Sequence, residues 1–152
     1  ALHTAIDCFE KRGKKGYLFT VGDEEPPLDL PAAGIARVFG DRVQRDFSSR
    51  ELLTLVSRMY LVFHVIVEEG SHARHNARRV RNLWTELLGQ RVISLSDHTQ
   101  LAEVIVSAIA VNEGNDRDRV IGSWSKKTAL VVRRAVGGLE PARERRTGLI
   151  RF

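Results

Sequence analysis

The chain contains one cysteine among 152 residues and no long hydrophobic run. A lone cysteine excludes an intrachain disulfide and a cysteine-rich zinc site, as is typical of proteins in a reducing compartment. We expect Cys8, which lies near Ile6 and Phe9, to be a buried structural thiol. No apolar run approaches the roughly 20 residues needed to cross a bilayer, and the N-terminal residues lack the pattern of a signal peptide. These absences predict a cytoplasmic protein.

The sequence also lacks the motifs of common enzyme sites. No phosphate-binding P-loop, dinucleotide-binding GxGxxG or nucleophilic GxSxG motif occurs. His72 and His75 have a spacing at which both rings can share a helix face, but no Glu or Cys completes the pattern of a zinc site. We therefore expect that the chain is not an enzyme. A hydrolase remains the alternative, and it depends on Asp97 and His98 acting as an acid/base pair beside a nucleophile.

Composition is that of one globular domain with a basic charge balance. The hydrophobic fraction of 43% and the length are sufficient for a single buried core. The formal net charge of +5 favours acidic partners such as nucleic acid or an acidic protein. Clusters of basic residues occur in "HARHNARRVR" and "RERR". Such clusters form either a solvated helix face or a binding surface.

Three short apolar runs predict three strands, at residues 17–21, 61–69 and 91–97. The first, "YLFTV", is rich in aromatic and β-branched residues and lies between glycines. Strands that are apolar on both faces belong to the buried interior of parallel sheets. We therefore expect the strand at 17–21 to be central in its sheet.

Helical spacing of apolar residues, together with start and stop signals, predicts the remaining elements. Ser48 precedes Glu51 by three residues, which indicates a capping box, and Asp97 precedes Gln100 in the same way. The two prolines of "DEEPPLDLP" predict a loop. The expected helices cover residues 2–12, 31–39, 49–59, 73–88, 98–111 and 117–136.

Alternation of strands and helices predicts an α/β fold, with a three-stranded parallel sheet, right-handed crossovers and helices on both faces in a Rossmann-like arrangement. Three strands are few for such a sheet, so we expect one edge to be open to a further strand. Residues 1–112 form the predicted α/β domain. Residues 113–152 add a C-terminal helix and a basic tail that is mobile or docked on a partner.

The segment "HTAIDCFEKRGKKGYLFTVGDE" resembles the central part of a von Willebrand factor A (VWA) domain of the bacterial and phage intracellular kind. The similarity continues through "FSSRELL", "YLVFHVIV", "LLGQRVISLSD" and "LAEVIVSAI", in the order of the last three strand and helix units of that fold. It covers roughly residues 1–112. The resemblance implies the carboxyl-terminal half of a VWA domain.

The resemblance also implies a protein-interaction function assisted by a divalent cation. In that family Mg²⁺ lies at the carboxyl edge of the sheet, held by a DxSxS motif, a Thr and an Asp. Asp23 matches the last of these, with Glu24 and Glu25 beside it as partner-binding candidates, whereas DxSxS is absent from the chain. The resemblance thus implies that a missing amino-terminal half or a complementing chain completes the site, with an AAA+ ATPase as a possible partner. Alternatively, Asp23 is a turn residue.

A basic nucleic-acid-binding protein is the second hypothesis. It places the arginines of the predicted helix at 73–88 against phosphates, so that affinity falls steeply with salt. Trp84 and Trp124 lie on apolar helix faces, where we expect core or interface packing rather than base stacking. The arginines of this hypothesis are Arg74, Arg78, Arg79 and Arg81, with Arg143, Arg145 and Arg146 of the tail.

Overall fold

The computed structural model describes residues 7–40 and 43–142. Contacts divide the chain into two compact units, residues 1–98 and residues 99–152. The first unit contains the sheet with its covering helices, and the described part of the second, residues 99–142, contains three α-helices. Each unit is described by itself below.

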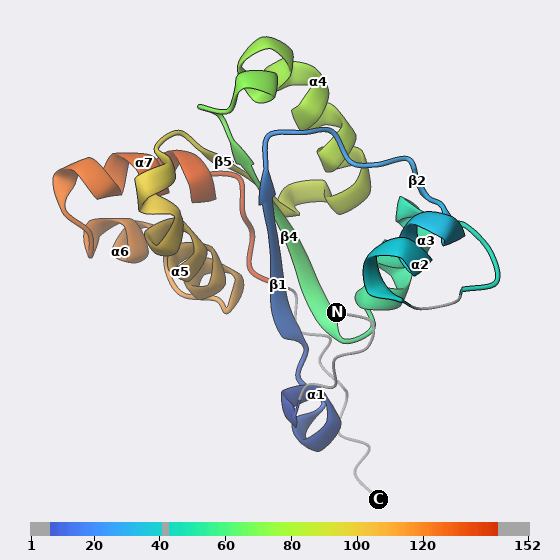
Figure 1. Ribbon diagram of the computed structural model, residues 1–152. Helices are drawn as coiled ribbons and strands as arrows, with labels where there is room; N and C mark the ends of the chain where they lie inside the picture. The colour runs from blue at the N-terminus through green and yellow to red at the C-terminus, as the bar shows by residue number, and fades with distance from the viewer. Residues whose placement is uncertain (1–6, 41–42, 143–152) are drawn as a thin grey trace, which may run out of the picture. The chain divides into compact units, whose positions relative to one another are not determined.

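The first unit is built on a three-stranded parallel sheet of strand order β1-β4-β5 (Figure 1). The strands are β1 (Gly16–Gly22), β4 (Tyr60–Val67) and β5 (Val92–Leu95). The predicted α/β class with a parallel sheet is therefore confirmed. Because the pairing is parallel throughout, all three strands end at the same edge of the sheet.

The central strand is β4, so the prediction of a central position for residues 17–21 is wrong. Every residue of β4 from Val62 to Ile66 is buried, whereas β1 is half-buried and Val21 is 45% exposed. An apolar run indicates that a strand is suited to burial. The run does not indicate whether a strand has one neighbour or two. Among the described strands, β1 pairs with β4 alone.

The backbone of β1 has one bonded side and one open side. The Gly16 N–H donates to the Met59 carbonyl at 2.9 Å, which points the peptide groups of Gly16 toward β4. Since backbone direction alternates along a strand, the peptide groups of Leu18 also face β4. Those of Phe19 and Val21 face away from it, toward the side on which no described strand pairs.

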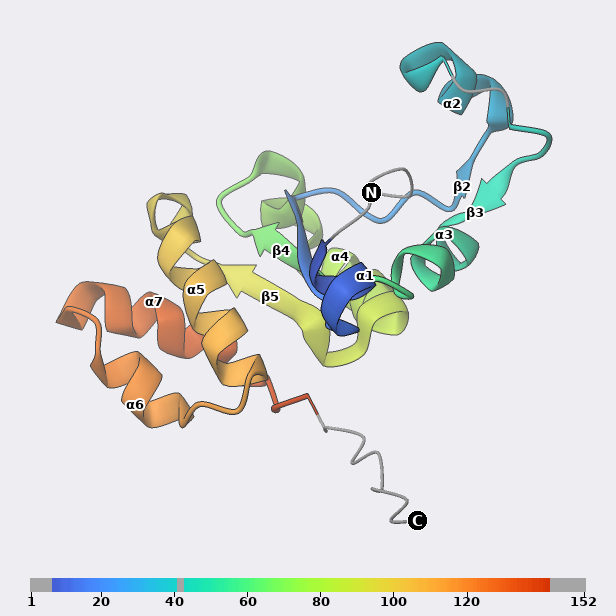
Figure 2. The same cartoon turned by 90° about the horizontal axis from the view of Figure 1, so that it is seen from below.

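Helices α3 (Ser49–Val56) and α4 (Ser71–Leu88) cover one face of this sheet (Figures 1 and 2). The chain steps in one direction from β1 to β4 to β5, and crossovers of the same hand then place their helices on the same face. α4 changes direction at Asn76, which has non-helical φ and ψ. The buried core on this face consists of Tyr60, Val62, Ile66, Ala73, Val80, Leu88 and Val92.

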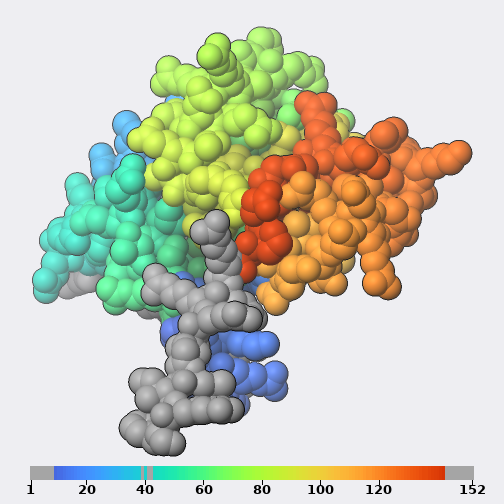
Figure 3. Space-filling view, turned by 180° about the vertical axis from the view of Figure 1, so that it is seen from behind, coloured from blue at the N-terminus to red at the C-terminus, as the bar shows by residue number. Residues whose placement is uncertain are grey.

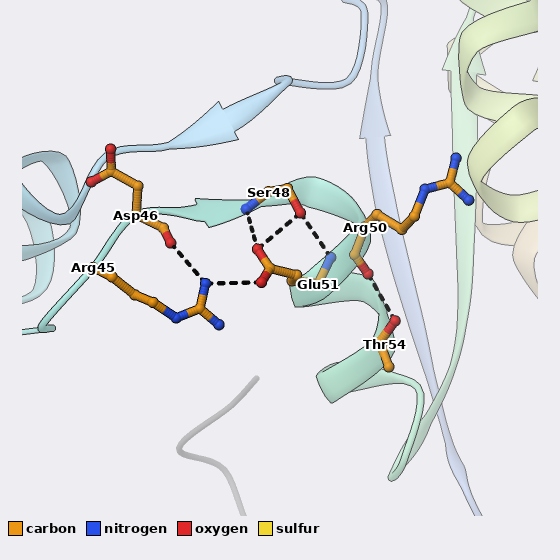
Figure 4. Close-up of polar contacts among 6 residues, drawn as sticks. All are labelled: Arg45, Asp46, Ser48, Arg50, Glu51 and Thr54. Carbon is orange, nitrogen blue, oxygen red and sulfur yellow. Dashed lines mark hydrogen bonds and ion pairs between the residues drawn. The ribbon is translucent and has the colours of Figure 1, made fainter.

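The capping box predicted at the start of α3 is confirmed (Figure 4). The Glu51 carboxylate accepts the Ser48 backbone N–H at 2.9 Å, and the Ser48 hydroxyl accepts the Glu51 N–H at 3.2 Å. Arg45 donates to the other carboxylate oxygen of Glu51 at 2.8 Å. The Ser48 N–H and then the Arg45 hydrogen bond lower the pKa of Glu51 to about 2.

An arm between β1 and α3 holds a short antiparallel ribbon that the sequence did not reveal (Figure 2). Strand β2 (Asp29–Leu30) pairs with β3 (Phe47–Ser48), and α2 (Ala32–Phe39) lies between them. Two-residue strands are too short to show a period of two, which is why residues 29 and 30 were expected in a loop. α2 itself ends at Gly40, which has φ of 73°, close to its predicted boundary.

The first unit also includes α1 (Asp7–Arg12), which is the described part of the helix predicted at 2–12. Short 3₁₀ turns, Gly89–Arg91 and His98–Gln100, precede β5 and α5. The predicted capping of α5 by Asp97 is wrong, because α5 begins at Leu101 with Gln100 as its N-cap.

The second unit contains α5 (Leu101–Asn112), α6 (Arg117–Gly122) and α7 (Lys126–Val136). The prediction of one helix over 117–136 is wrong, because the helix stops after Gly122 and a new one starts with Ser125 as its N-cap. Between them, the Trp124 indole N–H donates to the buried Ser107 hydroxyl of α5 at 2.9 Å. Among the described helices, none is long and apolar enough to cross a bilayer.

Candidate functional site

Acidic residues follow all three strands where they end. Asp23 follows β1, Glu68 and Glu69 follow β4, and Asp97 lies two residues after β5. We call this region, defined by Asp23, Glu69 and Asp97, the acidic edge. Open α/β sheets bind ligands outside the carboxyl ends of their strands. The acidic edge is therefore the candidate functional site of the first unit.

Asp23 contacts the start of α4. Its Oδ2 atom accepts a hydrogen bond from the backbone N–H of His72 at 3.0 Å. The first N–H groups of a helix have no intrahelical partner, and they carry the positive end of the helix dipole. The carboxylate thus satisfies one of these donors, although Asp23 belongs to a different segment of the chain. This contact gives Asp23 a structural role whether or not it also binds a metal.

Gly70, the N-cap of α4, is closely approached by the Asp23 side chain. A Cβ atom built at Gly70 would overlap the carboxyl group and the Cβ of Asp23. The backbone of Gly70 has φ of −61° and ψ of 146°, which any residue adopts. Glycine is needed here for space and not for conformation.

The same arrangement repeats one strand further along the sheet. Glu69 Oε2 accepts the backbone N–H of His98 at 2.8 Å, at the start of the 3₁₀ turn that follows β5. It also contacts His98 Nδ1 at 2.7 Å. These two hydrogen bonds, the backbone one first, lower the pKa of Glu69 below its ordinary value. In both cases the acid after one strand binds the first turn after the next strand.

Glu69, Asp97 and His98 each offer one ligand atom within 4.8 Å of the others. The hypothesis of an acid/base pair named Asp97 as the partner of His98, and the structure also brings the Glu69 carboxylate to His98. Sequence reasoning missed Glu69, and its signal was the acidic pair that ends the second apolar run. Two carboxylates and an imidazole do not match the roughly six oxygen ligands that Mg²⁺ prefers.

Glu24 and Glu25 connect the proline loop to α4. Glu25 pairs with Arg79 at 2.7 Å, and its side chain is 28% exposed. Glu24 is 74% exposed, lies 3.6 Å from His72 Nδ1, and accepts the Trp84 indole N–H on its carbonyl at 2.9 Å. Of the two predicted partner-binding acids, Glu24 is thus the more accessible.

His64 of β4 is buried beneath this loop at 3% exposure. Its ring stacks on that of Trp84 with centroids 3.7 Å apart, and its Nδ1 lies 2.8 Å from the Thr20 hydroxyl of β1. Burial lowers the pKa of His64 to about 4. Its buried Nε2 has no hydrogen-bond partner among the described residues. The imidazole is therefore a neutral core group at physiological pH.

All four arginines of α4 are exposed, and three of them also contact other segments of the first unit. α4 itself lies at the surface in the space-filling view, in green to yellow-green (Figure 3). Arg74 donates to the Glu69 carbonyl at 2.9 Å, Arg79 pairs with Glu25, and Arg81 donates to the Ser94 hydroxyl. The tail arginines of the nucleic-acid hypothesis, Arg143, Arg145 and Arg146, and the side chain of Cys8 lie outside the described residues.

His72 and His75, whose spacing lets both rings share a helix face, have different partners. His75 Nδ1 lies 2.8 Å from the Ser71 carbonyl, one turn back in α4. His72 lies beside the two acids of the proline loop. Both histidines belong to the first turns of α4, which begins at Ser71.

Replacing Gly70 by Ala tests the close approach of Asp23. Gly70→Ala is expected to reduce the free energy of unfolding by about 1–3 kcal/mol, because the new methyl group displaces the Asp23 side chain. Gly22→Ala is the matched control, since nothing lies within 4 Å of a Cβ at Gly22, and its effect should stay within about 0.5 kcal/mol. Urea denaturation measures both. Equal effects of the two substitutions would contradict the proposed overlap.

Replacing His64 by Phe tests its burial in the neutral form. In the unfolded chain His64 takes up a proton near pH 6.5, but in the folded protein only near pH 4. The unfolded state therefore binds more protons between these values, and stability falls as pH falls. We expect wild type to lose about 2 kcal/mol more than His64→Phe between pH 7 and pH 5 in urea denaturation. The exposed His75, replaced in the same way, should retain the wild-type profile; parallel curves for wild type and His64→Phe would refute neutral burial.

Comparison of the chain with protein-family models, with curated proteins and with solved structures found no match. The fold statement therefore rests on the geometry of the sheet, which is α/β, parallel and Rossmann-like.

Proposed function

We propose that this chain is a protein-interaction module of VWA type whose sheet is extended along β1 by a strand from outside the described residues. Its partner binds at the acidic edge, assisted by Mg²⁺. The observation that carries the proposal is the position of β1, an apolar strand with one open backbone side. The module has no catalytic role of its own in this proposal.

The composition of β1 supports pairing with a further strand. Natural edge strands are protected by charged residues, proline or bulges, which discourage pairing with other chains. The segment "GYLFTVG" contains none of these residue types. It has the aromatic and β-branched composition of an inner strand, and Val21 is 45% exposed. With a further strand paired on this side, β1 would become an inner strand of a parallel sheet, the position in which apolar strands of this kind normally occur.

The position of Asp23 supports metal-assisted binding only where further ligands are supplied from outside the described residues. Asp23 lies at the end of β1, beside the open side of the sheet, as the VWA resemblance requires of its metal-binding Asp. One Asp23 oxygen, Oδ2, already accepts the His72 N–H, so Oδ1 is the less engaged oxygen for Mg²⁺. The other ligands would have to come from the added strand, from water and from an acidic residue of the partner. An AAA+ ATPase is the partner class that the resemblance implies.

Nucleic-acid binding through α4 has weaker support. Arg74, Arg79 and Arg81 make hydrogen bonds or ion pairs within the first unit. Binding phosphates would compete with these contacts, which lowers the electrostatic gain of each arginine.

The open side of β1 is tested with Val21→Pro. Proline removes an N–H that faces away from β4, so it should block pairing on the open side and leave the β1–β4 bonds in place. The wild-type chain is expected to self-associate through β1 at concentrations on the order of 100 μM, and Val21→Pro should suppress this in sedimentation velocity. Val21→Thr, which keeps the N–H, is the control. A wild-type monomer at all concentrations would count against an open pairing edge.

The role of Asp23 is tested with Asp23→Asn. The amide oxygen still accepts the His72 N–H, so the free energy of unfolding should change by less than about 1 kcal/mol. Loss of the charge should abolish partner binding that depends on Mg²⁺, measured by pull-down with and without chelator. Asp29→Asn, an exposed acid of the arm, provides the matched control. If partner binding is insensitive both to chelator and to Asp23→Asn, the metal plays no part in it. Strand pairing along β1 is tested independently by Val21→Pro.

A further inference from the structure

Helix α7 of the second unit presents an exposed basic stripe that the sequence analysis did not single out. Five of its residues are exposed, and Leu130 among them is 70% exposed. At 3.6 residues per turn, the five lie on one continuous face, with Leu130 at the centre and two basic residues on each side. The α7 stripe consists of Lys126, Lys127, Leu130, Arg133 and Arg134.

Packing within the second unit turns this stripe outward. The opposite face of α7 is buried through Val132, Ala135 and Val136, and α7 lies alongside α5 and α6 (Figures 1 and 2). At its first turn, the Thr128 hydroxyl donates to the Gln100 side-chain carbonyl at 2.8 Å. The rotation of α7 about its axis is thus fixed by its apolar face, and the stripe cannot turn inward without exposing that face.

The stripe is also a local excess of positive charge. The eleven residues of α7 include four basic and no acidic residues, a charge of +4, while the whole chain carries +5. A local excess of one sign raises the concentration of oppositely charged partners near the surface.

We propose that the α7 stripe docks an acidic, amphipathic segment of a protein partner. An exposed leucine offers an apolar anchor, because burying its side chain against a partner removes apolar surface from water. The aliphatic stems of the flanking Lys and Arg side chains widen this apolar surface while their charged ends remain in water. The complementary surface is a helix with one or two apolar residues flanked by Asp or Glu.

Two features of the stripe favour such a segment over nucleic acid. The stripe contains no aromatic residue on which a base can stack. Its centre is an aliphatic side chain, and burying leucine against a phosphate backbone gains little because that backbone is hydrated and charged. The proposal concerns the second unit and does not depend on strand pairing at β1 or on a metal at Asp23.

The test uses the 152-residue chain and three fluorescent probes. The first probe is a helical peptide with two leucines at i and i+4 flanked by glutamates. The second is the same peptide with glutamine in place of glutamate. The third is a DNA duplex of about 20 base pairs. Fluorescence anisotropy at low and high salt gives the dissociation constants. The variants are Leu130→Ser, the double variant Arg133→Glu/Arg134→Glu, and a control with the same charge change at exposed sites of the first unit, Lys14→Glu/Arg58→Glu.

The proposal expects the glutamate peptide to bind more tightly than the glutamine peptide, with affinity that falls as salt rises. Leu130→Ser and the Arg133/Arg134 reversal should each weaken this binding about tenfold, and the Lys14/Arg58 reversal should not. Circular dichroism verifies that each variant is folded. Any of three results would overturn the proposal: no binding of the glutamate peptide, equal binding of the glutamine peptide, or tighter binding of DNA that is unaffected by Leu130→Ser.

Discussion

Parallel pairing of three strands is the constraint on which the first unit depends. It sends every strand end to one edge, so α4, which begins soon after β4, and the 3₁₀ turn that begins soon after β5 also start there. Helix starts bring N–H groups without intrahelical partners, and the acids of this edge supply the acceptors. Asp23 and Glu69 each satisfy the first turn that follows the neighbouring strand. The acidic edge is therefore partly a structural requirement of the sheet.

An acid at the end of a strand can serve the fold, the function or both, and this makes its role hard to interpret from sequence. The composition around Asp23 fits a turn residue, a helix cap and a metal ligand equally well, because all three use the same carboxylate oxygens. The fold assigns one oxygen to His72 and leaves the other available. A function at this edge therefore has to be compatible with the capping contact between Asp23 and α4.

Local patterns in the sequence predicted much of the fold because their causes are local. The three apolar runs became β1, β4 and β5, and the spacing of Ser48 and Glu51 became a capping box. The edge position of β1, the short β2–β3 ribbon and the bond from Glu69 to His98 depend on residues far apart in the chain. No periodicity or spacing contains that information. The break between α6 and α7 was local, but the apolar spacing continues across it and concealed it.

The two tryptophans lie in different units, each bonded through its indole N–H to a distant segment. Trp84 binds the proline loop and stacks on His64, while Trp124 binds Ser107 of α5. Since the chain has no other tryptophan, replacing either one leaves a single tryptophan, whose fluorescence, excited at a wavelength that tyrosine does not absorb, reports on one unit alone. The folding of the sheet and that of the helical unit can therefore be followed separately in the intact chain, without any attached dye.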